Sequence, residues 1–390
     1  MKITEVSTVR LRYPMEIPMA DAIHYMPERP LLIVQVHSDA GITGMGEVAA
    51  YGGDLESMEA LVLGVLKPIV VGQDPFAVER LWQQMATRPH QRGSRGMLMM
   101  AISGVDIALW DIIGQAVKTP LYRLLGGFRD ELTAYASAGF YAGGKDAAAL
   151  AEEVAGYAER GFEWVKIKVG RNPDLLWNPL HQMDARGYAA VTFEEDIERV
   201  RAAREAIGRR VKLAIDANNA WSPSEALRFM EAIGPDQVAW LEEPVATENR
   251  RGSTEVAQAL STPVAGYETE TGLAGFRDLI LSSAVDIVQP DVIWTGGITP
   301  CRKIAAFAEA FNLPVVPHVF SSALSTIANM HFIASIPNGG LLEFDQNPNP
   351  LRSQLFEEPI VVDARGKVAM PDEPGLGVRL SQETIDRYRV

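Results

Sequence analysis

The sequence predicts an α/β fold, a modified (β/α)7β or (β/α)8 TIM barrel with an α+β capping domain. The main observation is a regular spacing in the second half of the chain, where short apolar runs end on an ionisable residue every 23 to 27 residues. A strand, a helix and two loops take about that many residues in such a barrel. The six ionisable residues are Asp216, Glu242, Glu268, Asp291, His318 and Glu343.

The first third of the chain shows strand patterns followed by helix patterns, which predicts a separate α+β domain. Apolar runs at residues 31–37 and 43–48 flank a turn-rich spacer and predict a hairpin. Apolar residues then recur at helical spacing over residues 55–66, 76–85 and 97–113.

From about residue 133 the chain alternates between strands and helices, with the first two barrel strands expected at 133–137 and 164–169. Capping boxes beginning at Thr192 and Ser222 predict two of the helix starts. In the tail we expect short strands at 360–362 and 367–370. The predicted parts are a capping domain at 1–127, a barrel at 128–355 and a C-terminal segment at 356–390 that returns to the capping domain.

One barrel interval is longer than the others. Lys168 and Asp216 are 48 positions apart, about 22 more than one barrel unit needs, and the excess lies at residues 171–191. A loop after a barrel strand emerges on the active-site face. This insertion is therefore either a partial lid over the active site or a surface loop that is solvated or contacts another subunit.

Composition is that of an ordinary globular enzyme, with 390 residues, 47% hydrophobic residues and a net charge of −14. The acidic balance disfavours nucleic acid as a partner, because no basic stripe could replace counterions along a phosphate backbone. No long apolar run or signal-peptide core is evident, so we expect a cytoplasmic protein without a membrane segment. A single cysteine, Cys301, excludes an intrachain disulfide and a thiolate metal cluster.

Lys166 and Lys168 occupy alternate positions of one expected strand, so their amines should point the same way. Two like charges about 6.6 Å apart repel by roughly 2.5 kcal/mol at an effective dielectric of about 20. We therefore expect one lysine to be pushed toward the neutral amine that a general base requires. Lysines on an exposed strand would be inert, but apolar Ile167 between them favours a barrel interior.

Three acids, Asp216, Glu242 and Glu268, end consecutive expected strands and can converge from adjacent positions in the barrel. Three hard oxygen ligands without histidine or cysteine suit Mg²⁺, with Mn²⁺ as the alternative. Each acid alone would more simply be a helix cap or an arginine partner. Together, however, they would repel strongly without a cation. Glu270 has the same strand parity as Glu268 and is the alternative third ligand.

Asp291 and His318 follow on the sixth and seventh expected strands. A carboxylate beside an imidazole fixes its tautomer and raises its pKa, so this pair could move protons. Glu343 on the last strand could donate a hydrogen bond to a developing oxyanion if the neighbouring anions keep it protonated.

Taken together, the lysine doublet, the acid series, Glu242-Glu243-Pro244, the Asp291/His318 pair and the helix text at residues 101–111 resemble the enolase superfamily, mandelate racemase subgroup. Within that subgroup the chain is most similar to acid-sugar dehydratases and the galactarolactone cycloisomerase type. The resemblance implies Lys168 as base, Lys166 as partner of the substrate carboxylate, and Mg²⁺ bound by the three acids. It also implies that His318 with Asp291 acts on the other face.

The activity implied by the resemblance is Mg²⁺-dependent removal of the proton α to the carboxylate of a sugar acid, followed by loss of water to give a 2-keto-3-deoxy acid. A sugar-lactone cycloisomerase or a racemase or epimerase would use the same site. A noncatalytic barrel kept for assembly or ligand storage is the alternative of another class.

Substrate choice is expected to lie with the capping domain, where residues 19–29 would reach over the barrel mouth. The expected substrate-binding residues are Asn218, His24 and Tyr25, with Arg29 in the same segment. The expected partner is a small-molecule carboxylate, a sugar acid or its lactone, with no nucleic acid and no membrane. We also expect a homo-oligomer between dimer and octamer.

Overall fold

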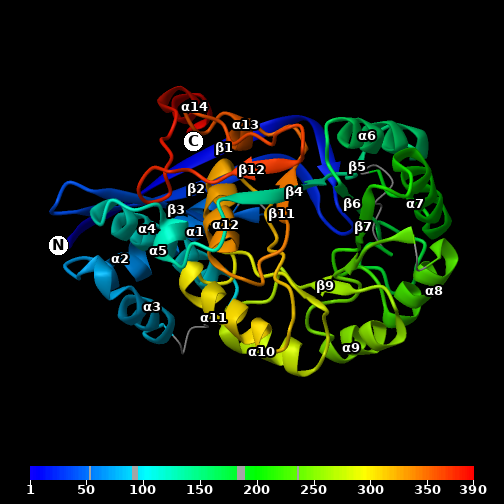
Figure 1. Cartoon of the computed structure of the whole chain (residues 1–390), viewed down its shortest axis with the longest axis horizontal. Coiled ribbons are helices and arrows are strands. Elements are labelled where there is room, and N and C mark those ends of the chain that lie inside the picture. Colours follow the sequence, from blue (N-terminus) through cyan, green and yellow to red (C-terminus); the bar gives the residue numbers. More distant parts are fainter. Residues whose placement is uncertain (52–53, 90–94, 182–188, 235–236) are drawn as a thin grey trace.

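The computed structural model shows a parallel strand ring surrounded by helices, with a second, antiparallel sheet beside it (Figure 1). The structure describes residues 1–51, 54–89, 95–181, 189–234 and 237–390. The barrel strands are β4 (Glu131–Ser137), β6 (Trp164–Lys168), β7 (Lys212–Asp216), β8 (Leu241–Glu242), β9 (Val264–Gly266), β10 (Ile287–Val288) and β11 (Leu342–Asp345).

These strands pair in the order β10-β9-β8-β7-β6-β4-β11. Val315 closes the ring, because it bridges Val288 on one side and Gly339 on the other, just before β11. The seventh position of the barrel is therefore a single bridged residue rather than a full strand. The predicted modified barrel is confirmed.

Helices of the barrel lie outside the ring and alternate with its strands (Figure 1). They are α6 (Ala147–Glu159), α7 (Phe193–Ile207), α8 (Pro223–Ile233), α9 (Arg250–Ala259), α10 (Gly272–Leu281), α11 (Ile298–Glu309) and α12 (Ala323–Ser335). Both predicted capping boxes are present, at Thr192 for α7 and Ser222 for α8. Phe229 of α8 packs against Trp221 and Phe193, with ring centroids 4.5 and 5.3 Å away, and so joins these two helices.

The barrel interior toward the amino ends of the strands is filled by side chains, as expected of a barrel of this size. Tyr135 and Trp240 meet edge to face with centroids 5.5 Å apart, and Trp164 stacks on Trp240. Lys166 lies next to this layer, its Nζ 5.5 Å from the Tyr135 ring centroid. This aromatic layer forms the floor beneath the Lys166 amine.

The capping domain is built on an antiparallel sheet of order β3-β2-β1-β5. Its strands are β1 (Ile3–Ala20), β2 (Tyr25–Ser38), β3 (Thr43–Val48) and β5 (Tyr141–Ala142), the last contributed by the barrel chain. Its helical elements are α1 (Leu55–Leu61), the π-turn η2 (Val62–Leu66), α2 (Lys67–Val70), the 3-10 turn η3 (Pro75–Ala77), α3 (Val78–Thr87), α4 (Met97–Ala116) and α5 (Leu121–Leu124).

Helix α4 lies at the centre of the capping domain and packs very closely on β3. A Cβ added to Gly46 would come within 2.1 Å of the Gly104 carbonyl oxygen, so only glycine allows this approach. By length and composition α4 could cross a membrane, but 83% of that stretch is buried inside the protein. It is placed as a core helix.

Two buried carboxyl groups of α4 join it to the rest of the molecule. Asp106 accepts hydrogen bonds from the Thr299 backbone N–H and hydroxyl at the start of α11, at 2.9 and 2.6 Å. Asp111 accepts the N–H groups of Leu376 at 2.8 Å and Met45 at 3.0 Å. Each carboxylate satisfies backbone donors that helix or loop ends leave free.

The third such carboxyl group is Glu47 of β3. It accepts hydrogen bonds from the Ser325 N–H at 2.8 Å and the Ser322 hydroxyl at the start of α12, which follows the His318 loop. Near it, Arg29 of β2 pairs with Asp345 at 3.0 Å.

The C-terminal segment contacts both parts of the molecule. It contains β12 (Lys367–Ala369) and α14 (Gln382–Tyr388), and the short helix α13 (Pro350–Ser353) precedes it. β12 confirms the strand predicted at 367–370 and pairs antiparallel with β4 of the barrel, whereas Leu11 of β1 bridges Arg389. The strand predicted at 360–362 is wrong, because those residues form no described strand. The predicted division into three parts, at 127/128 and 355/356, stays a prediction.

The first half of the insertion at 171–191 is anchored to the capping domain. Arg171 is buried and donates from Nη1 to the carbonyl oxygens of Asp21 at 3.0 Å and His24 at 3.3 Å. Leu176 and Trp177, by contrast, are exposed. The expectation of a lid falls partly on residues 182–188, including Tyr188, which lie outside the described residues.

Glu47 gives a pH-dependent prediction for folding stability. Burial raises the pKa of Glu47 to about 7, although hydrogen bonds from Ser322 and Ser325 lower it. A raised carboxyl pKa means that the folded state keeps its proton longer. Stability therefore falls as pH rises from about 4.5 through 7, by up to about 3 kcal/mol. Glu47→Gln should remove this part of the loss, so that its melting temperature relative to the parent protein increases from pH 5 to pH 8.

Melting curves at fixed protein concentration and ionic strength measure that difference. Glu163→Gln, at an exposed position, is the control and should show no pH-dependent difference. A constant difference between Glu47→Gln and the parent across this pH range would contradict the prediction.

Candidate active site

Three carboxylates from consecutive strands meet at the carboxyl end of the barrel. Asp216 ends β7, Glu242 ends β8 and Glu268 follows β9 by two residues. One oxygen from each acid lies within 4.8 Å of the other two. Asp216 and Glu242 are fully buried, and the Glu268 side chain is 13% exposed. A largely buried set of carboxylate oxygens suits Mg²⁺ or Mn²⁺, so these residues fit a divalent cation.

Glu270, the alternative third ligand, does not belong to this cluster. Its Oε2 accepts a hydrogen bond from Arg250 at 3.1 Å, and its Oε1 accepts the Thr271 N–H at 2.9 Å. The structure therefore favours Glu268 as the third member of the acidic cluster.

Lys166 and Lys168 both point from β6 toward the acids, which confirms that their side chains share one face of the strand. Lys168 Nζ lies 2.5 Å from Asp216 Oδ2. Lys166 Nζ lies 3.6 Å from that oxygen and 2.8 Å from Glu343 Oε1, and it also pairs with Glu242. Both ammonium groups are almost completely buried.

The expected neutral lysine is wrong for this arrangement. Burial lowers the pKa of both lysines, but the surrounding carboxylates raise the pKa of Lys166 and Lys168 above the ordinary value. The repulsion between the two amines is present, but Asp216 outweighs it at Lys168. A cation held by Asp216 and Glu242 would take up these negative charges and leave burial and repulsion to lower the lysine pKa.

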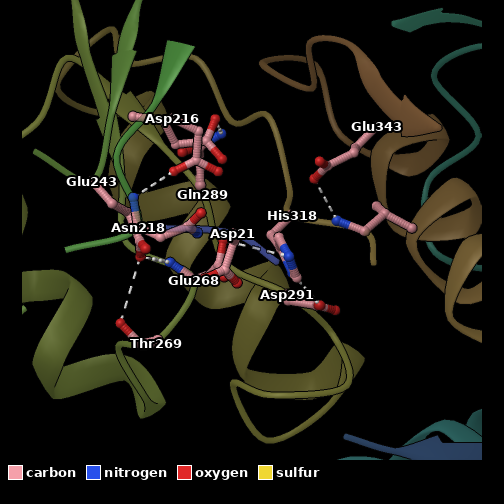
Figure 2. Close-up of polar contacts among 12 residues, drawn as sticks. Asp21, Asp216, Asn218, Glu243, Glu268, Thr269, Gln289, Asp291, His318 and Glu343 are labelled. Carbon is pink, nitrogen blue, oxygen red and sulfur yellow. Dashed lines mark hydrogen bonds and ion pairs between the residues drawn. The ribbon is translucent and has the colours of Figure 1, made fainter. Parts of the chain in front are cut away.

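His318 and Asp291 form the expected pair (Figure 2). His318 Nδ1 lies 2.8 Å from Asp291 Oδ2, and Nε2 lies 3.4 Å from Glu268 Oε2. Asn329 donates to Asp291 Oδ1 at 3.0 Å and so holds the carboxylate in place. Burial lowers the pKa of His318, but Glu268 and the Asp291 hydrogen bond raise it to about 9. The imidazole is thus oriented with Nε2 toward the acidic cluster.

Glu343 does not fit the expectation that it is held protonated. Its carboxylate accepts the Val319 N–H at 2.8 Å and pairs with Lys166. Burial raises the pKa of Glu343, but Lys166 and His318 lower it to about 2. It is therefore a carboxylate that holds Lys166 and the His318 loop, and the expected hydrogen-bond donation to an oxyanion is wrong for this protonation state.

Comparison with known families agrees with this geometry. An enolase C-terminal domain-like model matches residues 149–384, and the mandelate racemase/muconate lactonizing enzyme N-terminal domain matches residues 3–126. The chain belongs to the mandelate racemase/muconate lactonizing enzyme family. It is therefore a member of the enolase superfamily, as the sequence resemblance implied.

Members of this family with assigned activities are similar to the chain over nearly its whole length. Arabinonate dehydratase of Saccharolobus solfataricus is 36% identical over 94% of this chain and 93% of its own. D-galactarolactone cycloisomerase of Agrobacterium fabrum is 32% identical over 100% of this chain and 99% of its own. The crystal structure of a racemase from Streptomyces coelicolor with bound magnesium superposes with a TM-score of 0.85, at 31% identity and full coverage of both chains.

In this mandelate racemase/muconate lactonizing enzyme family member, a loop of the capping domain covers part of the barrel mouth. Ala22 packs against Gly170, two residues beyond Lys168, where an added Cβ would come within 3.2 Å of the Ala22 Cβ. Asp21 accepts the His24 N–H at 2.7 Å and binds His24 Nδ1 at 3.0 Å. The Asp21 hydrogen bond raises the pKa of His24, whose side chain is 63% exposed.

The other expected substrate-binding residues are placed differently. Asn218 lies next to the acids, where its N–H binds Asp216 Oδ1 at 2.9 Å (Figure 2). Its buried side-chain oxygen has no hydrogen-bond partner among the described residues. Tyr25 lines a separate cavity of about 250 Å³ with Ile17 and Tyr141. The Arg29 side chain is buried and forms an ion pair with Asp345, so it is not a free cation at the barrel mouth.

Two residues that orient Glu242 were not among the residues expected from the sequence. Trp240 Nε1 and Gln289 Nε2 donate to Glu242 Oε2 at 2.9 and 3.0 Å. Gln289 directly follows the sixth strand, so its position at a strand end was a usable signal. Trp240 lies just before its strand, and its sequence position carries no such signal. Its contact with Glu242 depends on the orientation of the indole ring inside the barrel.

Proposed function

We propose that the protein removes the proton α to the carboxylate of a sugar acid and then expels a β-hydroxyl as water, giving a 2-keto-3-deoxy acid. The observation that carries this proposal is the convergence of a basic and an acidic proton-transfer candidate, Lys168 and His318, on one cluster of three carboxylates. Removing such a weakly acidic proton requires a base and stabilisation of the resulting enediolate.

The donor set supports a magnesium-dependent enzyme, with manganese as a substitute. Asp216, Glu242 and Glu268 would hold the cation. When bound, it supplies Lewis-acid stabilisation of negative charge on the substrate carboxylate. Lys166 lies on the same side of the cluster and supplies a second positive charge there.

The side chains of this chain then perform a balanced proton transfer. Lys168, as the neutral amine, takes the α-proton, and the C–H electron pair enters the enediolate. His318 Nε2–H protonates the β-hydroxyl, the C–O bond breaks and water leaves. The resulting enol becomes the keto acid. Asp291 keeps the imidazole in the orientation that delivers this proton.

A sugar-lactone cycloisomerase is the second candidate, since the relative from Agrobacterium fabrum carries that name and covers the whole chain. In that case the leaving group is a ring oxygen. A racemase or epimerase would instead have His318 return a proton to the opposite face. A noncatalytic barrel is disfavoured, because every proton-transfer and acidic position is filled.

For substrate binding, we assign His24 and Asn218 to the sugar chain. His24 stands at the barrel mouth, and Asn218 presents an unsatisfied oxygen beside the acids. Tyr25 is kept as a more distant candidate. His24→Asn should raise KM with kcat little changed, because it removes a contact made equally in the ground and transition states. An unchanged KM would exclude His24 from substrate binding.

A screen of mono- and diacid sugars and their lactones in deuterated water with Mg²⁺ tests the function. NMR should show loss of the α-proton signal together with a keto acid for at least one substrate. A keto acid that forms from a lactone by ring opening, without loss of water, would identify the isomerase, and exchange with an epimeric product would identify the epimerase. No exchange and no product across the panel would reject the proposal. A cytoplasmic location and a homo-oligomer remain predictions.

A further inference from the structure

Glu243 has a fully buried carboxyl side chain and directly follows Glu242 at the end of β8. Its backbone has a φ of +41°, which is uncommon for a residue with a side chain. Glu242 turns into the acidic cluster, whereas Glu243 turns sideways toward the end of β9. A buried carboxylate in this position needs hydrogen bonds to offset its loss of water.

Those hydrogen bonds link the ends of three neighbouring strands. Glu243 Oε1 accepts the Glu268 backbone N–H at 3.0 Å, as Figure 2 shows. Its Oε2 accepts from Asn219 Nδ2 at 2.7 Å. Asn219 follows β7, Glu243 follows β8 and Glu268 follows β9, so one side chain spans the three strands that deliver the three acids.

A second layer holds this bridge in place. Thr247 donates to Asn219 Oδ1 at 2.8 Å and also contacts the Thr269 hydroxyl. Thr269 lies 3.5 Å from Glu243 Oε1. Figure 2 shows Thr269 and Glu268 on the same side of Glu243. The network therefore fixes the chain at the third acid and at the residue that follows it.

We propose that Glu243 is a positioning residue that keeps the Glu268 carboxylate within reach of Asp216 and Glu242. Glu268 needs this support more than the other two acids, because it lies beyond the end of its strand and lacks a sheet register of its own. Asp216 and Glu242 are both paired in the β7–β8 ladder. The inference rests on the proposed divalent cation site and assigns to Glu243 no contact with substrate.

Mn²⁺ binding to the purified full chain, without substrate, tests the proposal. Loss of a partner that orients a metal ligand typically weakens affinity by about 10- to 100-fold, and Glu243→Ala should do so. Glu243→Gln should recover most of the affinity, because its amide oxygen accepts the Glu268 N–H and its NH₂ can donate to a turned Asn219. The electron paramagnetic resonance spectrum of bound Mn²⁺ should change in Glu243→Ala and return in Glu243→Gln.

Two further variants keep the test decisive if Glu243→Ala folds poorly. Asn219→Gly removes the outer hydrogen bond and retains the left-handed backbone, at a φ of +67°, so a smaller loss of affinity is expected. Glu270→Ala is the matched control, since it removes a nearby buried carboxylate that binds Arg250 instead. Its Mn²⁺ affinity should stay at the parent value.

The outcomes separate this inference from the proposed function. If the parent protein binds no Mn²⁺, the proposed cation site fails and the inference fails with it. If the parent protein binds but Glu243→Ala and Asn219→Gly bind equally well, only the inference is overturned. Equal losses in Glu243→Ala and Glu243→Gln would also overturn it, because negative charge rather than hydrogen-bond geometry would then matter.

Discussion

Replacing Lys168 by methionine or His318 by asparagine is expected to lower turnover of the proposed sugar-acid substrate by about a thousandfold or more. A positioned proton-transfer group contributes roughly 10²- to 10⁴-fold, and methionine or asparagine keeps the side-chain volume without that ability. Lys168 is held against Asp216 and His318 against Asp291, so each proton-transfer group has a fixed position at the cluster. Steady-state keto acid formation measures the effect.

The two variants should also differ from each other. If Lys168 takes the α-proton, Lys168→Met loses deuterium exchange together with product. His318→Asn should still exchange the α-proton while losing the elimination of water. Lys303→Met, at an exposed pair with Glu79, is the control and should keep parent activity. Parent turnover in both active-site variants would refute the assignment of these residues.

Replacing Asp216 by asparagine is expected to abolish activity and to weaken Mn²⁺ binding by more than about 100-fold. Loss of a residue that only orients a metal ligand weakens affinity by up to roughly 100-fold, and loss of a ligand itself should cost more. Asp216 is central, because its Oδ2 lies near both lysine amines and its carboxylate belongs to the acidic cluster. The variant would leave two buried ammonium groups less compensated, so its melting temperature should fall as well.

Calorimetric titration with Mn²⁺ measures the affinity, and chelation of the parent enzyme followed by Mg²⁺ addition measures the dependence of activity on the ion. Asp372→Asn, whose side chain is 83% exposed, is the matched control and should bind as the parent does. Activity that survives exhaustive chelation, with parent affinity in Asp216→Asn, would contradict a cation at these acids.

Much of the fold could be read from the sequence because barrel units repeat. Spacing located the strand ends that carry Asp216 and Glu242, and local capping chemistry located the helices that begin after Thr192 and Ser222. Both signals are local in the sequence. The strand ends recur at a regular spacing, and each capping box has a fixed spacing between its two residues. The seventh strand was placed correctly in order, but it is reduced to a bridge at Val315.

The electrostatics of the site could not be read from the sequence in the same way. The spacing of Lys166 and Lys168 gives their mutual repulsion, but not the carboxylates that face them from β7, β8 and β11. The same omission led to the expectation of a protonated Glu343. A pKa depends on every charge within a few ångströms, and those distances exist only in the folded barrel.

Asp106, Asp111 and Glu47 have a consequence for engineering this enzyme family. Asp106 and Glu47 satisfy amide hydrogens of the barrel, and Asp111 satisfies one of the C-terminal segment. A capping domain transplanted from a relative with a different substrate preference must therefore carry acidic residues at these three positions. Without these acids, the chimera would have backbone N–H groups without hydrogen-bond partners where the capping domain meets the rest of the chain. The loop that positions the His318 imidazole would also become less rigid, and this loss would mask any change in substrate specificity.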